Sequence, residues 1–275
     1  MSNNLKKIRV CFIGAGPMTR AHILAFKDIK EVELVGIYNR TKEKAEELAS
    51  SLGIKKIYST IQNLYELGKP DLVVISVYET AKKQIMEICL PYKVPILCEK
   101  PIGLHYEESL EIVKLAELSY CPVWVGLNRR HYFSTIFAKN LLDLDSKNKR
   151  FVEVTDQQDL NIAEKLGHES GVIKNWRFAN SIHLVDYFST FLRGDVEKVS
   201  IHHAWNPMTP DFVSAHLKFT SGDEGLYKAY WNRPGPWSCT VSSKEYFIEL
   251  RPLEKLRYQR QGNREWHEPE NHVWD

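Results

Sequence analysis

A buried strand and a glycine-rich turn meet in the stretch Ile8-Arg9-Val10-Cys11-Phe12-Ile13-Gly14-Ala15-Gly16-Pro17-Met18-Thr19. The apolar run predicts a strand from Ile8 to Ile13, and a helix is expected from Met18 to Phe26. The glycines between them match the first two positions of the dinucleotide-binding fingerprint G-x-G-x-x-G. In that setting, backbone N–H groups and the helix N-terminus can hold a pyrophosphate. The alternative is a tight strand-to-helix turn that binds no ligand.

The third fingerprint position departs from the pattern. It holds Thr19, where glycine or alanine normally allows the helix to pack closely on the strand. The methyl and hydroxyl groups of Thr19 must therefore be accommodated at this packing contact. We expect the cofactor to contact the turn residues Gly14, Ala15, Gly16, Pro17 and Met18.

Short β-branched runs alternate with helical patterns as far as Leu127, which is typical of a doubly wound parallel sheet. Further strands are predicted at Leu34–Tyr38, Leu72–Val77, Val94–Cys98 and Val123–Leu127, with a weaker one near Ile57. Helices are predicted at Lys42–Leu52, Lys82–Cys89 and Tyr106–Leu118. Residues 1–127 are thus expected to form a dinucleotide-binding Rossmann domain.

The pattern of predicted helices and strands changes after Asn128. A helix is expected at Phe133–Leu142, a strand at Phe151–Thr155 and a helix near Ser181–Leu192, and the polar stretch Asp156–Gly171 is expected to be either a lid or a solvated connection. Runs of alternating polarity then follow at Val196–His203, Val213–Thr220, Gly225–Trp231, Cys239–Ser242, Phe247–Leu250 and Leu256–Gln259. These runs predict an open, mainly antiparallel sheet. The expected fold class is α/β, with an α+β domain over residues 128–275 that binds substrate and mediates oligomerisation.

Composition excludes several classes of function. The chain has 275 residues with a formal net charge of +2, and its basic residues are spread along it, so neither nucleic acid nor a membrane surface is expected as a partner. No apolar segment is long enough for a signal peptide or a membrane span, and we expect a cytoplasmic protein. The five cysteines show no C-x-x-C spacing. No metal site is expected, because the side chains of His202 and His203 would point to opposite faces of a strand.

One lysine stands where a buried strand ends. The run Val94–Cys98 leads directly into Glu99-Lys100-Pro101, and open α/β sheets bind ligands beyond the carboxyl ends of their strands. Pro101 pushes Lys100 toward an extended conformation, which predicts a stiff turn. The alternative is an ordinary surface lysine. We also expect cofactor contacts from four residues near strand ends, in addition to Lys100: Ser76, Val77, Glu99 and Asn128.

The end of the second strand bears on cofactor choice. An NAD site usually has an acidic residue there for the ribose 2′-hydroxyl, whereas this chain has Asn39-Arg40-Thr41. Arg40, with Lys44 one helical turn later, can pair with a 2′-phosphate. The pattern favours NADP over NAD, with Asn39, Arg40 and Lys44 as contacts. The alternative is that Arg40 stacks on adenine and either cofactor binds.

Taken together, the motifs resemble the Gfo/Idh/MocA family of glucose-fructose oxidoreductase and inositol dehydrogenase-like enzymes. They are Gly14-x-Gly16, Glu99-Lys100-Pro101, Gly126-Leu127-Asn128-Arg129-Arg130 and Ile182-His183-Leu184-Val185-Asp186. The resemblance implies a nicotinamide cofactor and a polyol, sugar or sugar-nucleotide substrate. It also implies that Lys100 binds the reacting hydroxyl or carbonyl and that His183 moves the proton.

Further substrate contacts follow from position. The resemblance assigns Arg129 to the site, and Asp186, one turn after His183, is expected to orient substrate or the imidazole. Trp176 and Asn180, just upstream of His183, are also expected to contact substrate. A homodimer or homotetramer is expected through the C-terminal sheet.

The sequence departs from the family pattern in three places. Ala179 replaces an aspartate that often stands four residues before the histidine, and Asn180 and Asp186 are the candidates for its role. The stretch Val77–Lys82 lacks the usual Pro-Asn-x-x-His. The family usually adds a closing segment after the sheet, which the sequence to Asp275 does not include. The alternatives to a sugar oxidoreductase are therefore a non-catalytic regulator that binds NAD(P) and sugar, and a reductase of a non-sugar carbonyl or imine.

Overall fold

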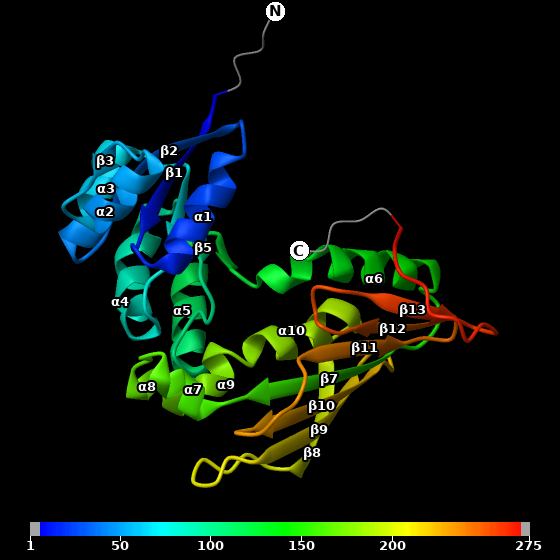
Figure 1. Ribbon diagram of the computed structural model, residues 1–275. Coiled ribbons are helices and arrows are strands. Elements are labelled where there is room, and N and C mark those ends of the chain that lie inside the picture. Colours follow the sequence, from blue (N-terminus) through cyan, green and yellow to red (C-terminus); the bar gives the residue numbers. More distant parts are fainter. Residues whose placement is uncertain (1–5, 271–275) are drawn as a thin grey trace, which may run out of the picture. The chain divides into compact units, whose positions relative to one another are not determined.

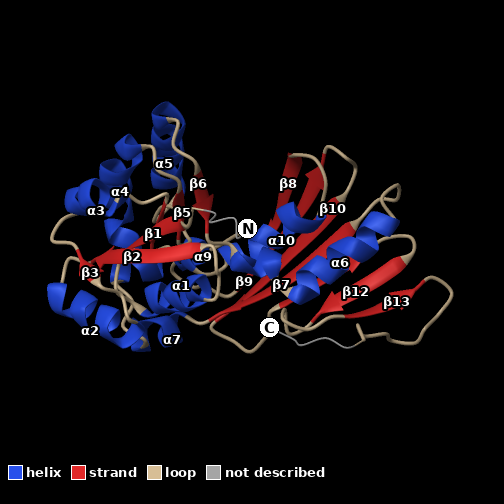
Figure 2. Cartoon of the chain, turned by 90° about the horizontal axis from the view of Figure 1, so that it is seen from above, coloured by secondary structure: helices blue, strands red, loops and turns tan. Residues whose placement is uncertain are grey.

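The computed structural model describes residues 6–270 and divides the chain into two units, Met1–Gly126 and Leu127–Asp275. The chain end at Asp275 lies outside the described residues. Each unit has its own sheet, so each is described separately (Figures 1 and 2).

The first unit is a parallel sheet with helices on both faces. Its strands are β1 (Ile8–Ile13), β2 (Val32–Tyr38), β3 (Lys56–Ile57), β4 (Leu72–Ile75), β5 (Ile96–Cys98) and β6 (Val123–Val125), in the spatial order β3-β2-β1-β4-β5-β6. The helices are α1 (Pro17–Lys27), α2 (Lys42–Leu52), α3 (Ile61–Gly68), α4 (Glu79–Cys89) and α5 (Tyr106–Ser119), with a 3₁₀ turn η1 at Leu90–Tyr92. The strand order reverses between β1 and β4, where α/β sheets of this order bind dinucleotides.

Alternate residues of β1 build two cores, one on each face of the sheet. Val10 and Phe12 pack with residues of α1 and α2, whereas Cys11 and Ile13 pack on the other face with residues of α3, α4 and α5. All five cysteines of the chain are free and buried. Burial raises the pKa of the Cys98 thiol to about 11, which keeps this thiol protonated at neutral pH.

The second unit is an open mixed sheet with helices on one face. After η2 (Asn128–His131) it comprises α6 (Phe133–Leu144), β7 (Phe151–Gln158), α7 (Leu160–Lys165), α8 (Ser170–Lys174), α9 (Trp176–Ala179), α10 (Ile182–Phe191), β8 (Val196–His203), β9 (Phe212–Phe219), β10 (Glu224–Trp231), β11 (Ser238–Ser242), β12 (Tyr246–Leu250) and β13 (Arg257–Arg260). The order is β13-β12-β11-β7-β10-β9-β8, and every neighbouring pair is antiparallel except β7 with β10. Figure 2 shows α6 and α10 on the same face, where Leu142, Leu184 and Phe188 pack onto Val152 and Val154.

Most of the predicted elements are confirmed, but some helices were not predicted and one expected loop is partly helical. Helix α3 was missed, although Thr60 caps it by accepting the N–H of Asn63 at 3.0 Å. The expected loop Asp156–Gly171 is instead the end of β7 followed by α7 and the start of α8. Asp159 caps α7 by accepting the N–H groups of Asn161 and Ile162, so side-chain capping orders a stretch whose polar composition suggested a loop.

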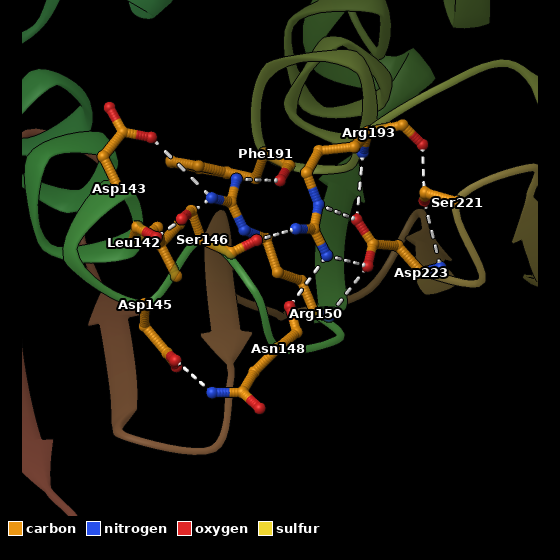
Figure 3. Close-up of polar contacts among 10 residues, drawn as sticks. All are labelled: Leu142, Asp143, Asp145, Ser146, Asn148, Arg150, Phe191, Arg193, Ser221 and Asp223. Carbon is orange, nitrogen blue, oxygen red and sulfur yellow. Dashed lines mark hydrogen bonds and ion pairs between the residues drawn. The ribbon is translucent and has the colours of Figure 1, made fainter.

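A triad of two arginines and a buried aspartate joins α6, α10 and the turn before β10 (Figure 3). Asp223 is fully buried and accepts hydrogen bonds from Arg193 at 2.7 and 2.9 Å and from the main-chain N–H of Arg150 at 2.9 Å. Although burial favours the neutral carboxyl, the Arg193 guanidinium and these N–H groups lower the pKa of Asp223 to about 2. The triad, with the Asp223 carboxylate ionised, therefore stabilises the second unit.

Candidate functional site

The turn after β1 runs against the end of β4. The N–H of Gly14 donates to the main-chain oxygen of Tyr38, and the N–H of Ser76 donates to that of Ile13, both at 2.9 Å. A Cβ atom on Gly14 would lie 2.1 Å from the main-chain oxygen of Ser76, and Gly14 has φ +114°. Only glycine fits both the contact and the backbone conformation.

The departure at Thr19 is accommodated by this same contact. Thr19 is fully buried in α1, and its hydroxyl donates a long hydrogen bond of 3.4 Å to the main-chain oxygen of Ser76. The threonine thus fills the space between helix and strand and satisfies its own polar group. The turn keeps its shape without the small third residue.

The N-terminus of α1 is open to a ligand. Gly16 is the N-cap, Pro17 follows it, and neither a side-chain cap nor an acidic residue occupies the first turn. A Cβ atom on Gly16 would meet nothing within 4 Å, and Met18 beside it is half exposed. The buried Oγ of Ser76 has no hydrogen-bond partner among residues 6–270. Exposed helix N–H groups and an unsatisfied hydroxyl fit the pyrophosphate of a dinucleotide. Ala15 packs on the adjoining core.

The loop after β2 is positively charged. Arg40 and Lys44 are exposed, and Asn39 donates from Nδ2 to the main-chain oxygen of Thr41 at 2.8 Å. The loop from Asn39 to Thr41 contains no carboxylate, and Glu43 in the first turn of α2 is the nearest acidic residue in sequence. This composition can receive a phosphate on the adenosine ribose.

The segment that carries Lys100 is anchored on two sides. Glu99 is 8% exposed, and one of its carboxylate oxygens lies 2.7 Å from Nε2 of His22 on α1. Its other oxygen accepts the N–H of Lys100 at 3.2 Å. On the other side, Nζ of Lys82 on α4 donates to the main-chain oxygens of Glu99 and Pro101. The Lys100–Pro101 peptide bond is cis, and Val77 packs on the core cluster of this sheet face.

In the second unit, His183 and Asp186 lie one turn apart on α10, and both are buried. Both carboxylate oxygens of Asp186 accept hydrogen bonds from Arg130, one of them from Nε at 2.6 Å. This bond to the carboxylate raises the pKa of Arg130 above its usual value. The structure thus commits the Asp186 carboxylate to Arg130, and the expected contact of Asp186 with substrate stays a prediction.

Arg129 lies in an aromatic environment at η2. Its guanidinium carbon is 4.9 Å from the ring centre of Trp237 and 5.6 Å from that of Tyr132. Nη1 of Arg129 lies 3.3 Å from Glu254. The two rings hold the guanidinium in place through cation–π attraction, and Glu254 holds it through an ion pair. Asn128, the preceding residue, is exposed.

Trp176 and Asn180 converge on one buried glutamine. Nε1 of Trp176 and Nδ2 of Asn180 both donate to Oε1 of Gln158 at 2.8 Å. The Nε2 group of Gln158 donates to Asp156 at 2.6 Å, and the hydroxyl of Tyr227 donates to the other Asp156 oxygen at 2.8 Å. Burial raises the pKa of the Asp156 carboxyl, and the hydrogen bonds from Tyr227 and Gln158 oppose this effect. The amide of Gln158 is therefore held at both ends.

Sequence reasoning missed His22, Lys82, Asp156 and Gln158. Continuing the alternation of Val152 and Val154 by two further steps places Asp156 and Gln158 on the buried face of β7, so that signal was available. No local pattern marks His22 or Lys82, because their partners are 77 and 17 residues away.

The sheet order, the glycine turn and the open helix N-terminus define the first unit as a dinucleotide-binding Rossmann domain. Residues 8–127 match the model of the Gfo/Idh/MocA family, which is described as an oxidoreductase family with an NAD-binding Rossmann fold.

Two curated relatives match over about half of the chain. Glucose-6-phosphate 3-dehydrogenase of Bacillus subtilis (strain 168) is 30% identical over 138 residues, which are 50% of this chain and 38% of that enzyme. Inositol 2-dehydrogenase 1 of Mycolicibacterium vanbaalenii is 30% identical over 129 residues, which are 46% of this chain and 37% of that enzyme. The matched region thus covers less than two fifths of either relative.

Similarity to solved structures extends over both units. UDP-N-acetylglucosamine 3-dehydrogenase from Acidithiobacillus ferrooxidans superposes with a TM-score of 0.77 at 18% identity, covering 98% of this chain and 85% of that one. At this identity the likeness shows the fold. Within residues 6–270, no helix is long and apolar enough to cross a membrane, and no three His, Cys, Asp or Glu side chains are placed to hold a metal ion.

Proposed function

We propose that the protein is an oxidoreductase that transfers a hydride between NADP, or NAD, and the hydroxyl- or carbonyl-bearing carbon of a sugar, polyol or sugar nucleotide. The observation that carries this proposal is the glycine turn at Gly14 beside the open N-terminus of α1, in a unit that matches the model of an oxidoreductase family. The named relatives act on a sugar phosphate and on inositol, which supports a polyhydroxylated substrate.

The phosphates of the cofactor would be held by two groups of residues. The pyrophosphate fits the open turn and helix N-terminus, and the adenosine ribose phosphate fits the positive loop after β2. The contacts we assign are Gly14, Ala15, Gly16, Pro17, Met18, Asn39, Arg40, Lys44, Ser76, Val77, Glu99, Lys100 and Asn128. When bound, the nicotinamide supplies or accepts the hydride. Arg40 is the basis for preferring NADP.

Lys100 and His183 are proposed as the acid–base pair. Hydride transfer forms or consumes an alkoxide, and the Lys100 ammonium stabilises that negative charge. His183 moves the proton, since an imidazole changes its charge near neutral pH. Arg129, Trp176, Asn180 and Asp186 are proposed as additional substrate contacts. Trp176 would pack the face of its ring against a sugar ring, and Arg129 would supply N–H donors.

The deciding experiment is a screen of sugars, sugar phosphates, polyols and sugar nucleotides, with the absorbance of reduced nicotinamide as the readout. For an active substrate, Lys100→Met should retain NADPH binding and lose turnover, because it removes only the ammonium group. Lys114→Met, an exposed lysine of α5, is the matched control and should keep turnover. Full turnover of Lys100→Met would refute the assignment.

A second candidate is a non-catalytic regulator that binds NAD(P) and a sugar. The observation in its favour is Ala179, which is 4% exposed and leaves no carboxylate at the position of the family aspartate. Tight NADPH binding without oxidation or reduction across the whole panel would select this function. Turnover only with non-sugar carbonyls or imines would select the third alternative.

We propose that the protein is a homodimer or homotetramer that forms through the second sheet. A Cβ atom on Gly225 would lie 2.7 Å from Phe188 of α10, so Gly225 faces the helices. Because side chains alternate along a strand, Leu226, Lys228 and Tyr230 of β10 lie on the opposite face of the sheet. These residues are half-buried, and Lys228 pairs with Glu153 of β7 at 2.8 Å. Light scattering tests this assembly, and Tyr230→Glu should shift it to a monomer. A monomeric parent protein would refute it.

We also propose that the protein is cytoplasmic. Five free cysteines fit a reducing compartment, and the location of a fluorescent fusion protein tests the proposal.

A further inference from the structure

Lys82 is a lysine without exposed surface. It lies in the first turn of α4, its side chain is 0% exposed, and it forms no ion pair with a carboxylate within residues 6–270. Lysines are almost never fully buried unless they are paired. Burying an ammonium group costs several kcal/mol unless its N–H groups are satisfied, so a fully buried lysine calls for a specific reason.

The reason lies in the partners of its ammonium group. Nζ donates to the main-chain oxygen of Glu99 at 2.6 Å and to that of Pro101 at 2.5 Å. These two carbonyl groups stand on either side of Lys100. A charged donor strengthens such bonds, because charge-assisted hydrogen bonds are about twice as strong as neutral ones. The Lys82 ammonium therefore ties the two residues that flank Lys100 to α4.

Other contacts complete the anchoring of this turn. The N–H of Glu99 donates to the main-chain oxygen of Ile75 at 2.8 Å, and the Glu99 carboxylate receives the N–H of Lys100. The Lys82 ammonium bonds both carbonyl groups, and the Glu99 carbonyl accepts one further, weak hydrogen bond from Sγ of Cys98 at 3.6 Å. An apolar side chain of the same length would fill the same volume and would leave both carbonyls without this donor.

We propose that Lys82 is a positioning residue for Lys100. Its buried ammonium fixes the turn Glu99–Pro101 and so confines the Lys100 amine to the orientation needed for reaction. The consequence for turnover rests on the proposed role of Lys100, whereas the effect on the turn does not.

Three variants separate positioning from simple core filling. Lys82→Met keeps the length and apolar volume and removes the donors. Lys82→Gln restores N–H donors without charge. Lys83→Met, at the adjacent exposed lysine that pairs with Glu111, is the matched control. Thermal unfolding establishes that each variant is folded, and Lys82→Gln replaces Lys82→Met in every comparison if the methionine variant does not fold.

Two readouts need neither cofactor nor substrate. The first is hydrogen exchange of the amides from Glu99 to Gly103, and the second is the acetylation rate of the Lys100 amine relative to that of Lys114, measured by peptide mass spectrometry. In Lys82→Met we expect the exchange to accelerate by about 10-fold or more and the relative acetylation rate to change by about 5-fold, since an anchoring contact is lost. Lys82→Gln should be intermediate, and Lys83→Met should match the parent protein.

With an active substrate, the kinetic parameters provide a further test. Lys82→Met should lower kcat by about 100-fold and change KM and the NADPH Kd by less than about 3-fold, because displacing a reacting group by about 1 Å can cost a factor of that size. Unchanged exchange and acetylation in Lys82→Met would overturn the proposal, as would a parent-like kcat. If the parent protein turns over no substrate, the proposed function fails while the exchange and acetylation results still decide whether Lys82 positions Lys100.

Discussion

Gly14 and Ser76 are in contact through their backbones, so closely that a Cβ atom on Gly14 would lie 2.1 Å from the main-chain oxygen of Ser76. The two residues follow neighbouring parallel strands at the point where the strand order reverses. The turn that would hold the pyrophosphate is thus shaped by an adjacent strand as well as by its own glycines. Two glycine substitutions separate these contributions.

Gly14→Ala should destabilise the protein by about 2–4 kcal/mol, because the new methyl group meets backbone and the residue has a positive φ. Urea unfolding measures this loss. Gly16→Ala is the control, since its methyl group meets nothing within 4 Å and the free energy of unfolding should stay within about 0.5 kcal/mol of the parent value. NADPH binding to Gly16→Ala should nevertheless weaken by about 10-fold, because the methyl group occupies the approach to the helix N-terminus. Equal stability of the two variants would contradict the role of the Ser76 contact.

Arg40→Ala should weaken NADPH binding by about 10- to 100-fold and leave NADH binding within about 3-fold of the parent value, since only the 2′-phosphate pairs with the guanidinium. Fluorescence titration with both cofactors measures the two effects. Lys42→Ala, which removes an exposed lysine paired with Glu46, is the matched loss of one positive charge and should change neither affinity. A parent protein that binds NADH as tightly as NADPH would remove the basis for preferring NADP.

Gln158→Leu should lower the free energy of unfolding by about 2–4 kcal/mol, because it leaves the Trp176 and Asn180 donors without their buried acceptor and removes one of the donors to the Asp156 carboxylate. Urea unfolding followed by tryptophan fluorescence reports on this change. Gln157→Leu, at the neighbouring position on the opposite face of β7, loses one exposed hydrogen bond to Arg233 and should cost less than about 1 kcal/mol. Equal losses in both variants would show that the buried network contributes nothing beyond a surface contact.

Asp223 should make the stability of the protein depend on acidity. Its pKa is lowered from 3.8 to about 2, so the folded state binds the proton more weakly than the unfolded state does. The resulting stabilisation is fully present above the unfolded pKa and is lost as the pH falls through the folded pKa, a contribution of about 2 kcal/mol that disappears between about pH 4 and pH 2.

Asp223→Asn should remove this acid-dependent loss and destabilise the protein at neutral pH by about 3–5 kcal/mol, since Arg193 and Arg150 lose their shared carboxylate. Unfolding curves measured at a series of pH values test both effects. Asp143→Asn is the control, because Asp143 lies 3.7 Å from Arg150 but is largely exposed, and its stability profile should follow that of the parent protein. An Asp223→Asn profile with the parent's acid dependence would refute the assignment.

The sequence predicted those elements whose signal is local. The bounds of β1, α2 and β8 match the expected ones. In β1 and α2 the hydrophobic pattern follows directly from burial, whereas β8 is exposed along almost its whole length. Helices α3 and α7 to α9 were not predicted, because they are too short to show a clear helical period. Their order depends on caps such as Thr60 and Asp159 and on packing against the rest of their own unit.

The candidate site residues likewise divide into those that a local motif predicts and those that no motif predicts. Gly14, Lys100 and His183 were selected from motifs, and their roles stay predictions until the variants are measured. Lys82 had no such signal, and Gln158 had only the strand alternation that continues beyond the predicted strand end at Thr155. Their hydrogen-bond partners are 17 and 22 residues distant in the chain, so only the folded crossovers bring them together.

The sequence by itself thus determined the Rossmann class of the first unit, the glycine turn after its first strand and the mainly antiparallel sheet of the second unit. Tertiary structure alone decided how Thr19 fits beside Ser76, which carbonyl groups accept hydrogen bonds from Lys82 and which residue donates to the Asp186 carboxylate. The physical reason is the range of the interactions. Periodicity and turn geometry are properties of a few consecutive residues, whereas a buried polar group takes its partner from whichever strand or helix the fold places against it.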